Sequence, residues 1–473
     1  MSIAKTDCDL ERGRIHPVKQ TMSKYDEMMM RAEGKTEQMC LFTDERSLFE
    51  KLCSLEYLKE GFRAVKKNKG APGIDGVTIE EFGNRLDKER AQLKEGLESW
   101  TYKPKPVRRV EIPKPGKNAG VRLLGVPCVD DRVIHATLKI LLEPILDPAF
   151  SDNSYGFRPG RNQRQAIEAA QRIVRSGKEH VVDIDLSKFF DRVHHDRLMS
   201  RLSISIPDKR ILRIIGNILR SGVMKGGLIA PTKEGTVQGS PLSPLLSNVV
   251  LDELDKELER RGLEFCRFAD DCNIFVGSRK SADRVMKSIS KFIEGKLKLL
   301  INQEKSKVAL SKFVKFLGMT IIIGTIAISA KSINNAMAKV KEMTPRGTHM
   351  KLEETIKQFN SWYTGWASYY SMTQYPSQLG KIEAHFRRRI RSRLIDQQKK
   401  KRNLFNKFVK RSVPRSLAAK TAFSNRGRWA LSLTRATHMA YPNRWFIQVM
   451  SQRIKSEDEQ AHWFELDQWI KIT

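Results

Sequence analysis

Membrane-spanning proteins and disulfide-stabilised secreted proteins are excluded first, because the sequence has little of what either class needs. The longest apolar-rich stretch, residues 319–330, is too short to cross a bilayer. The N-terminal segment MSIAKTDCDLERGR is polar and lacks the apolar core of a secretory signal. The six cysteines form no CxxC pair and no cysteine–histidine cluster with zinc spacing. We therefore expect a protein of a reducing, cytoplasmic compartment that has no membrane partner.

Acidic residues are also scarce relative to basic ones. The chain of 473 residues has 54 Asp and Glu against 86 Lys and Arg, which gives a formal net charge of +32 and a pI of about 9.9. An excess of this size favours a polyanionic partner, above all nucleic acid. With 40% hydrophobic residues, the chain is long enough to bury a core without disulfides and to form roughly two to four domains.

The excess charge is concentrated in one part of the chain. Residues 331–428 hold 23 Lys and Arg against 5 Asp and Glu, a net charge of +18, whereas residues 429–473 are balanced. The same stretch contains an aromatic run, QFNSWYTGWASYY, at residues 358–370. Trp362 and Trp366 share a helical face and are expected in the core, while some of the basic groups are expected to contact phosphate.

Residues 46–330 hold both helical and strand patterns, and their mixture over 181–330 is typical of an α+β fold. Helical spacing of apolar residues predicts helices at 46–67, 134–146, 242–258 and 281–297. Strands are predicted at 107–113, 121–127, 181–186, 264–269, 272–277 and within 316–328. The first two strands would form a hairpin, and the strand at 181–186 would run directly into a helix. The strands at 264–269 and 272–277 would be joined by Asp270 and Asp271 as a two-residue turn.

Two acidic clusters stand out within this mixed region. Alternation along the strand VVDIDL places Asp183 and Asp185 on one face, where carboxylates are costly unless they are paired or bound to a metal. Asp270 and Asp271 form the second cluster, and by themselves they would be explained by turn chemistry. Two such clusters in one very basic chain instead favour a pair of Mg²⁺ ions, since carboxylates hold this metal well.

A series of motifs, in order and spacing, resembles the bacterial group II intron reverse transcriptases, also called maturases. The resemblance covers residues from about 46 to about 445, which is most of the chain. Its motifs are NKGAPGIDGVTIEEF (68–82), RLLGVP (122–127), SYGFRPGRNQRQAI (154–167), DIDLSKFFDRV (183–193), GTVQGSPLSPLLSN (235–248), FADD (268–271), INQEKSKV (301–308) and FVKFLG (313–318).

The resemblance implies a right-hand polymerase with fingers, an antiparallel palm sheet and a helical thumb. It implies fingers and palm at 46–330, a thumb or maturase X domain at 331–400 and a DNA-binding region at 401–473. Residues 1–45 are polar and Met-rich without a clear period, which predicts an N-terminal extension. Many relatives end in a cysteine–histidine endonuclease domain, but this sequence has no cysteine after Cys272, so that domain is not expected. The compartment implied is the bacterial cytoplasm or nucleoid.

The resemblance also assigns residues to the polymerase site. Asp185, Asp270 and Asp271 would hold Mg²⁺, with Asp185 preferred to Asp183 because it precedes the aromatic run at the family's spacing. The nucleotide site would contain Lys114 and Arg122 for the triphosphate, Phe190 beneath the sugar, and Gln238 beside the nucleotide or template. From the residues alone, Lys114 and Arg122 could equally be a solvated hairpin edge. One of Phe189 and Phe190 is expected to be core.

Nucleic-acid contacts are expected on basic residues of three segments: SYGFRPGRNQRQAI, the basic helix RRRIRSRL (387–394) and the run KKKR (399–402). The predicted set is Arg158, Arg387, Arg388, Arg391, Lys399 and Lys400. Three departures from the family pattern are Phe268 in place of the usual Tyr of YADD, Val237 in place of Pro, and Thr364 in place of a frequent Arg. None of them changes an acidic residue.

The function implied is an RNA-directed DNA polymerase that uses dNTPs and a DNA primer on an RNA template. It would also bind its group II intron RNA to assist splicing, and target DNA during intron mobility. Two alternatives remain open: a stand-alone reverse transcriptase acting in repair or defence, and an RNA-binding splicing factor whose polymerase has lapsed. The intact acidic trio weighs against the last of these.

Overall fold

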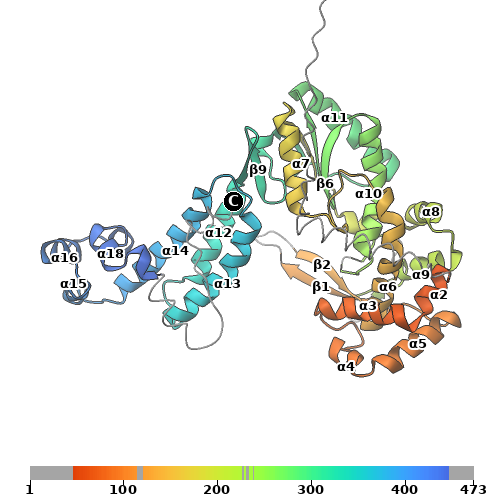
Figure 1. Cartoon of the computed structure of the whole chain (residues 1–473), viewed down its shortest axis with the longest axis horizontal. Helices are drawn as coiled ribbons and strands as arrows, with labels where there is room; N and C mark the ends of the chain where they lie inside the picture. The colour runs from red at the N-terminus through yellow and green to blue at the C-terminus, as the bar shows by residue number, and fades with distance from the viewer. Residues whose placement is uncertain (1–45, 114–120, 226–227, 231–233, 238, 447–473) are drawn as a thin grey trace, which may run out of the picture.

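The structure is a computed structural model that describes residues 46–446, except 114–120, 226–227, 231–233 and 238. Figure 1 shows a mixed α/β part, which runs from α2 to β8, beside a helical part formed by α12 to α18. The hairpin of β9 (Met319–Ile322) and β10 (Thr325–Ile328) lies where the two parts meet.

The N-terminal helices pack around α6 (Val129–Leu146). The single helix predicted at 46–67 is in fact two helices, α2 (Leu48–Cys53) and α3 (Leu55–Lys67). The break falls at Ser54, whose extended backbone ends α2 and whose side chain caps α3 by accepting the Tyr57 backbone N–H. Helices α4 (Ile79–Asn84) and α5 (Leu86–Glu98) follow.

The predicted hairpin of β1 (Val107–Pro113) and β2 (Val121–Val126) is confirmed as an antiparallel pair. It belongs to a sheet of order β2-β1-β4-β5, completed by β4 (Val223–Lys225) and β5 (Leu228–Ala230). The connecting residues 114–120, with the predicted site residue Lys114, lie outside the described residues.

The palm sheet has the antiparallel order β6-β7-β3-β8, which confirms the predicted architecture. Its strands are β3 (His180–Ile184), β6 (Glu264–Phe268), β7 (Asp271–Val276) and β8 (Lys307–Leu310). One face buries Val182 and Ile184 in the main core, together with residues of α10 (Ser243–Arg260) and α11 (Arg279–Phe292). The other face packs Val181 and Phe275 against α7 (Gln163–Arg175) and carries the acidic residues of β3 and β7.

Two local predictions are wrong. Residue Lys188 has a left-handed backbone (φ 50°), so the chain leaves β3 through a short 3-10 turn, Phe189–Arg192, before α8 (His195–Ser205). The hairpin turn consists of Ala269 and Asp270, because Phe268 pairs with Asp271 and Asp271 already belongs to β7. Helix α9 (Lys209–Leu219) follows α8, α11 ends in a π turn (Ile293–Leu297), and further 3-10 turns lie at Asp147–Ala149 and Ser311–Phe313.

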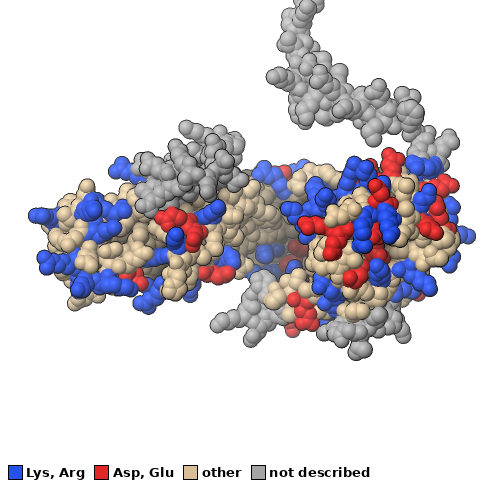
Figure 2. All heavy atoms as spheres, turned by 90° about the horizontal axis from the view of Figure 1, so that it is seen from below, with Lys and Arg blue, Asp and Glu red and all other residues tan. Residues whose placement is uncertain are grey.

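The helical part has its own aromatic core. Its helices are α12 (Ala330–Met343), α13 (Leu352–Tyr370), α14 (Ser377–Asp396), α15 (Lys401–Lys410), α16 (Arg415–Ala422), α17 (Arg428–Leu431) and α18 (Arg435–Ala440). Phe359 stacks on Phe386 with ring centroids 3.7 Å apart, and Trp362 and Trp366 pack against this core as predicted. Figure 2 shows Lys and Arg side chains spread over this part, with a few patches of Asp and Glu among them. No helix in the described part of the chain is long and apolar enough to cross a membrane.

Candidate active site

Carboxylates from two neighbouring palm strands meet at one edge of the sheet. The register pairs Ile184 with Cys272, so Asp185 and Asp271 occupy adjoining positions where β3 ends and β7 begins. Asp270 is exposed at the tip of the β6–β7 turn, and Asp183 faces Asn273 one step further along β3. The structure therefore brings together the three predicted metal ligands and a fourth carboxylate.

Burial and mutual repulsion raise the pKa values of three of these four carboxylates. Burial raises the pKa of Asp271 to about 7, and the carboxylates of Asp183, Asp270 and Asp185 add to the rise. The pKa of Asp183 is raised to about 6, again first by burial. The loss of hydration around the Asp270 carboxylate also raises its pKa, and the negative charge of Asp185 adds to this rise. A bound cation would relieve this repulsion, so the donor chemistry fits a divalent metal.

Several basic residues lie around the carboxylates, among them Lys307, whose charge lowers the pKa of Asp183 against its overall rise. Lys305 Nζ is 3.7 Å from Asp185 Oδ1, and the exposed Arg122 on β2 lowers the pKa of Asp270, against its overall rise. The positive charge of Lys315 likewise lowers the pKa of Asp271, against its overall rise. The position of Arg122 suits its predicted role near the triphosphate. Our sequence reasoning missed Lys305 and Lys315, although each lies within a motif, INQEKSKV and FVKFLG, that already carried the family resemblance.

A different cluster meets a simple distance criterion for metal binding. Among the described residues, Asp75, Cys128 and Asp130 have potential ligand atoms within 4.8 Å of one another, closer than those of the palm carboxylates. However, Lys105 Nζ lies 3.1 Å from Asp75 and 2.7 Å from Asp130 and neutralises them. Burial raises the pKa of the Cys128 thiol to about 11, which disfavours the thiolate. This cluster is therefore an ion-pair network rather than a metal site.

The backbone of Asp185 is fixed by the segment that precedes β8. Ser306 accepts the Asp185 backbone N–H at 3.0 Å through its hydroxyl, and the Asn302 backbone N–H donates to the Asp185 carbonyl at 2.8 Å. Leu186 forms a β-bridge with Ile301. The motif INQEKSKV thus sets the position at which the first carboxylate leaves the sheet.

The turn that carries Asp270 is held by a buried arginine that our sequence reasoning did not single out. Arg267 has no exposed surface, and its guanidinium donates five hydrogen bonds. Two go to the Asp255 carboxylate (2.7 and 2.5 Å), and the others to Asn248 Oδ1 (3.1 Å), Ser154 Oγ (2.7 Å) and the Ala269 carbonyl (2.9 Å). All five guanidinium donors are therefore used.

The bond to Ala269 matters because that residue has a left-handed backbone, with φ 57°. This conformation costs a non-glycine residue about 1–2 kcal/mol. Gly156 packs directly beneath the turn, since a Cβ there would lie 2.3 Å from the Ala269 nitrogen, and Asn248 Nδ2 donates to the Gly156 carbonyl at 2.9 Å. Arg267 therefore joins α10, the loop that begins at Ser154 and the β6–β7 turn into one unit.

The predicted sugar-contacting residue, Phe190, lies in the 3-10 turn that follows β3. Phe189 is buried, 3% exposed, whereas Phe190 is only partly buried and packs edge-on against Phe189 with ring centroids 5.3 Å apart. The GTVQG loop is bound to this turn, since the Thr236 backbone N–H donates to the Phe190 carbonyl at 2.6 Å. Gln238 itself lies outside the described residues.

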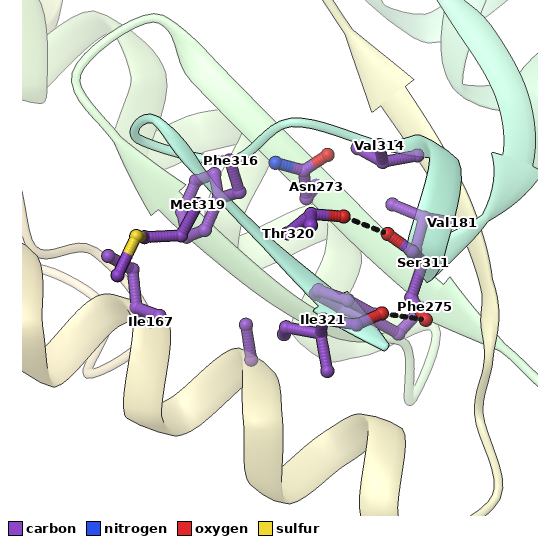
Figure 3. Close-up of a pocket in the computed structure, with 11 residues that line it drawn as sticks. Ile167, Val181, Asn273, Phe275, Ser311, Val314, Phe316, Met319, Thr320 and Ile321 are labelled. Carbon is purple, nitrogen blue, oxygen red and sulfur yellow. Dashed lines mark hydrogen bonds between the residues drawn. The ribbon is translucent and has the colours of Figure 1, made fainter. Parts of the chain in front are cut away.

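Figure 3 shows a largely apolar cavity lined in part by Asn273, the residue that pairs with Asp183 in the palm sheet. Its volume is about 290 Å³, including the part open to solvent, and it lies between α7, the palm sheet and β9. Asn273 contributes a buried amide for which the described residues provide no hydrogen-bond partner, while the Thr320 hydroxyl donates to the Ser311 carbonyl at 3.1 Å. This apolar lining does not suit a nucleoside triphosphate, because the described residues that line the cavity offer no positive charge to the phosphates.

The structure gives Arg158 a role other than the predicted nucleic-acid contact. Its guanidinium is buried, 8% exposed, and pairs with Asp147 at 2.7 Å. It also donates to the carbonyls of Ser151 and Ser154. Because its donors are directed to protein acceptors, Arg158 stabilises the SYGF loop and is not placed to bind phosphate.

The basic helix α14 likewise departs from the prediction. Arg391 is buried and donates to the Tyr441 carbonyl and Asn443 Oδ1, and burial lowers the pKa of its guanidinium to about 10. Arg387 pairs with Glu383 at 3.0 Å. Arg388 stacks on Trp429, with its guanidinium carbon 3.8 Å from the ring centroid. These three arginines chiefly hold the helical part together.

The two predicted lysines differ from these arginines. Lys399 and Lys400 are both exposed, at the junction between α14 and α15. Neither lies in a buried network like that of Arg391, so both remain accessible to a polyanion. Their nucleic-acid contact stays a prediction.

The sequence comparisons agree with the carboxylate geometry. Residues 112–321 match the family of reverse transcriptases (RNA-dependent DNA polymerases). The chain is therefore a reverse transcriptase, with the palm, fingers and helical thumb of a right-hand polymerase. Residues 333–412 match the group II intron maturase-specific domain, so the chain belongs to the group II intron reverse transcriptase and maturase family.

Two curated relatives illustrate the similarity. Protein YkfC of Escherichia coli (strain K12) is 33% identical over 293 residues, which are 54% of this chain and 76% of that protein. Group II intron-encoded protein LtrA of Lactococcus lactis subsp. cremoris is 29% identical over 372 residues, which are 63% of this chain and 60% of LtrA. A solved partial Cas6-RT-Cas1–Cas2 complex aligns over 53% of this chain and 43% of its own, with 24% identity and a TM-score of 0.35.

Proposed function

We propose that this chain copies RNA into DNA by metal-assisted nucleotidyl transfer, and that it binds its group II intron RNA to assist splicing and mobility. The observation that carries the polymerase proposal is the meeting of Asp185, Asp270 and Asp271 at one sheet edge, with Arg122 and Lys305 beside them. Primer extension on an RNA template by the parent protein, compared with a carboxylate variant, tests this part of the proposal.

The carboxylates of Asp185, Asp270 and Asp271 would hold Mg²⁺. When bound, this metal supplies a Lewis acid that activates the primer 3′-hydroxyl and offsets charge on the transferred phosphate. The contribution of the chain itself is placement and charge. Ser306 and Arg267 hold the backbones of the two acidic segments, and Arg122 provides a positive charge for the nucleotide phosphates.

We assign the polymerase to residues 46–330, the thumb to 331–400 and target-DNA binding to 401–473. Support for binding in the thumb comes from its charge and from the maturase-specific match at 333–412. A net charge of +18 over residues 331–428 suits the phosphate backbone of a folded RNA.

The identity of that RNA distinguishes an intron-encoded enzyme from a stand-alone one. We expect that RNAs crosslinked to the protein in its host and then sequenced will be dominated by a group II intron. The same protein purified from host cells that were not crosslinked serves as the background control. If crosslinked reads spread over unrelated transcripts with no intron enriched, the maturase part of the proposal is wrong and the polymerase part is unaffected.

Sugar selection is expected to depend on Phe190. The partly buried ring stands five residues after Asp185, where it can fill the space of a ribose 2′-hydroxyl. A ribonucleotide would then be displaced from the primer, and misplacement of about 1 Å can cost roughly a hundredfold in rate. We expect Phe190→Val to raise ribonucleotide incorporation at least tenfold relative to deoxyribonucleotides. Parallel primer extensions with NTPs and dNTPs measure this ratio.

Phe189→Val is the matched control, because it removes the same side-chain volume from the neighbouring position. Phe189 is buried in the core, so this variant should lower the melting temperature and leave the sugar preference unchanged. Equal discrimination by Phe190→Val and the parent would place the sugar gate elsewhere.

A further inference from the structure

A second cationic site lies in the helical part, far from the palm in the sequence. It is a cavity of about 670 Å³, including its solvent-open part, between the C-terminal end of α12, the second half of α14 and the start of α17. Four of its lining residues are arginines: Arg346, Arg389, Arg393 and Arg428. Among the described residues that line it, none is a carboxylate.

The arginines are held in place mainly by neutral groups. Arg389 donates to the Thr344 carbonyl at 2.6 Å and to the Thr344 hydroxyl, and Arg393 donates to Thr355 Oγ1 at 3.0 Å and to the Met350 carbonyl. Neutral acceptors fix the guanidinium groups but leave their charges uncancelled. The cavity is therefore pre-organised for an anion.

Among the described residues, Arg428 alone of these four has an ion-pair partner, the Asp396 carboxylate at 2.6 Å. Arg346 is exposed at the cavity mouth, in the segment that follows α12. Burial lowers the pKa of Arg389, and repulsion from Arg428 adds to this effect. The positive charges of these arginines thus line one cavity, and their mutual repulsion costs free energy.

A purely structural role accounts for part of this arrangement. Arg389 caps the C-terminal end of α12 through the Thr344 carbonyl, and Arg393 fastens the following loop. Neither role requires Arg346 and Arg428 to line the same cavity. The shared cavity is the feature that points to a ligand.

An aromatic platform completes the site. Trp429 lines the cavity and is 39% exposed. Arg388 lies over its ring at 3.8 Å from the centroid and donates to its backbone carbonyl at 3.3 Å. The indole is held in place by this contact and keeps exposed surface on which a base could stack.

We propose that this cavity binds one unpaired nucleotide of RNA, with its phosphate held by the arginines and its base stacked on Trp429. The proposal rests on the proposed RNA-binding function and deepens it, since it names the site and the form of the ligand. A base can enter a cavity only when it is unpaired, and folded RNA presents such bases in loops and bulges. Paired, stacked bases of duplex DNA do not fit this geometry.

The experiment uses the full-length protein and a fluorescently labelled RNA hairpin with a single-nucleotide bulge. A fully paired hairpin of the same stem is the comparison probe, and anisotropy titrations give both dissociation constants. We expect the parent to prefer the bulged hairpin. Trp429→Leu should weaken binding of that probe about tenfold and abolish the preference. Arg346→Gln should lower the log–log salt slope by about 0.7, the contribution of one phosphate on a single strand.

A methylphosphonate at the bulge tests the phosphate contact directly, because it removes one backbone charge. With this probe, Arg346→Gln and the parent should bind equally. Arg415→Gln is the matched control, since Arg415 is an exposed arginine on α16, outside the cavity. Its change in salt slope should not depend on the methylphosphonate.

Two outcomes would overturn the site. If the parent binds both hairpins equally, or if Arg346→Gln and Arg415→Gln behave alike on both backbones, the cavity does not select an unpaired nucleotide, although RNA binding by the thumb would stand. If the parent binds neither RNA, the RNA-binding part of the proposed function also fails. Arg346 is exposed, so its variant is expected to fold, and a thermal melt of Trp429→Leu checks the second variant.

Discussion

Asp270→Asn should abolish Mg²⁺-dependent cDNA synthesis on a primed RNA template. The amide keeps the size of the carboxylate but loses its charge, so a ligand for the metal is lost at the tip of the β6–β7 turn. Metal stabilisation of several kcal/mol corresponds to a fall in rate of about a thousandfold. Single-turnover primer extension measures it. Binding of RNA should be retained, because the basic helical part is unchanged.

The matched control is Asp283→Asn, which removes one carboxylate from the surface of α11, where Asp283 pairs with Arg279 at 3.2 Å. This variant should synthesise cDNA at the parent rate. Extension by Asp270→Asn at the parent rate would refute the metal assignment. A parent protein that extends no primer under any divalent metal would instead contradict the polymerase function itself.

The strands around the proposed metal ligands could be predicted from sequence because their patterns are local. Alternation along VVDIDL placed Asp183 and Asp185 on one face, and the structure has Val182 and Ile184 buried on the other. The spacing of the two apolar runs around FADD predicted a tight hairpin. The exact turn residues differed by one, because pairing of Phe268 with Asp271 requires a left-handed Ala269, and sequence pattern gives no such signal for alanine.

The roles of the arginines could not be predicted, since they depend on partners distant in the chain. Arg391 and Arg158 occupy basic motifs that suggest phosphate contact, yet protein groups accept their hydrogen bonds: a carbonyl and an amide for Arg391, and carbonyls and the Asp147 carboxylate for Arg158. Arg267 lies within the apolar strand β6. It can be fully buried because the Asp255 carboxylate, twelve residues earlier in the chain, pairs with it from α10. The sequence shows the charge of such residues, but only the fold shows whether protein groups already accept their hydrogen bonds.

The buried network around Arg267 leads to the second large effect. Removing its charge would leave Asp255 unpaired in the core, at a cost of about 3–5 kcal/mol, so an alanine variant would report mainly on folding. Lysine keeps the charge next to Asp255. However, its single nitrogen cannot replace a planar group that binds Asp255, Asn248, Ser154 and the Ala269 carbonyl at once.

The suitable control is Arg197→Lys. Arg197 on α8 donates two hydrogen bonds to the Glu253 carboxylate of α10, at 2.8 and 2.7 Å. It therefore resembles Arg267 in pairing a guanidinium with a carboxylate of the same helix, but it has no contact with the β6–β7 turn. This substitution should lower the melting temperature slightly and leave the polymerisation rate unchanged.

We expect Arg267→Lys to remain folded and to lose about a hundredfold in the rate of cDNA synthesis, because displacing a catalytic carboxylate by about 1 Å costs roughly that much. Without the bond to its carbonyl, Ala269 can leave its left-handed conformation, and the Asp270 carboxylate then loses its fixed place beside Asp185. The Mg²⁺ concentration that gives half-maximal rate should therefore rise, which a general loss of stability would not cause below the melting temperature. Magnesium titrations of single-turnover extension, run beside thermal melts of both variants, provide the measurement. If Arg267→Lys is folded and matches the parent in both rate and Mg²⁺ dependence, Arg267 serves folding alone, and another group holds the β6–β7 turn in its active geometry.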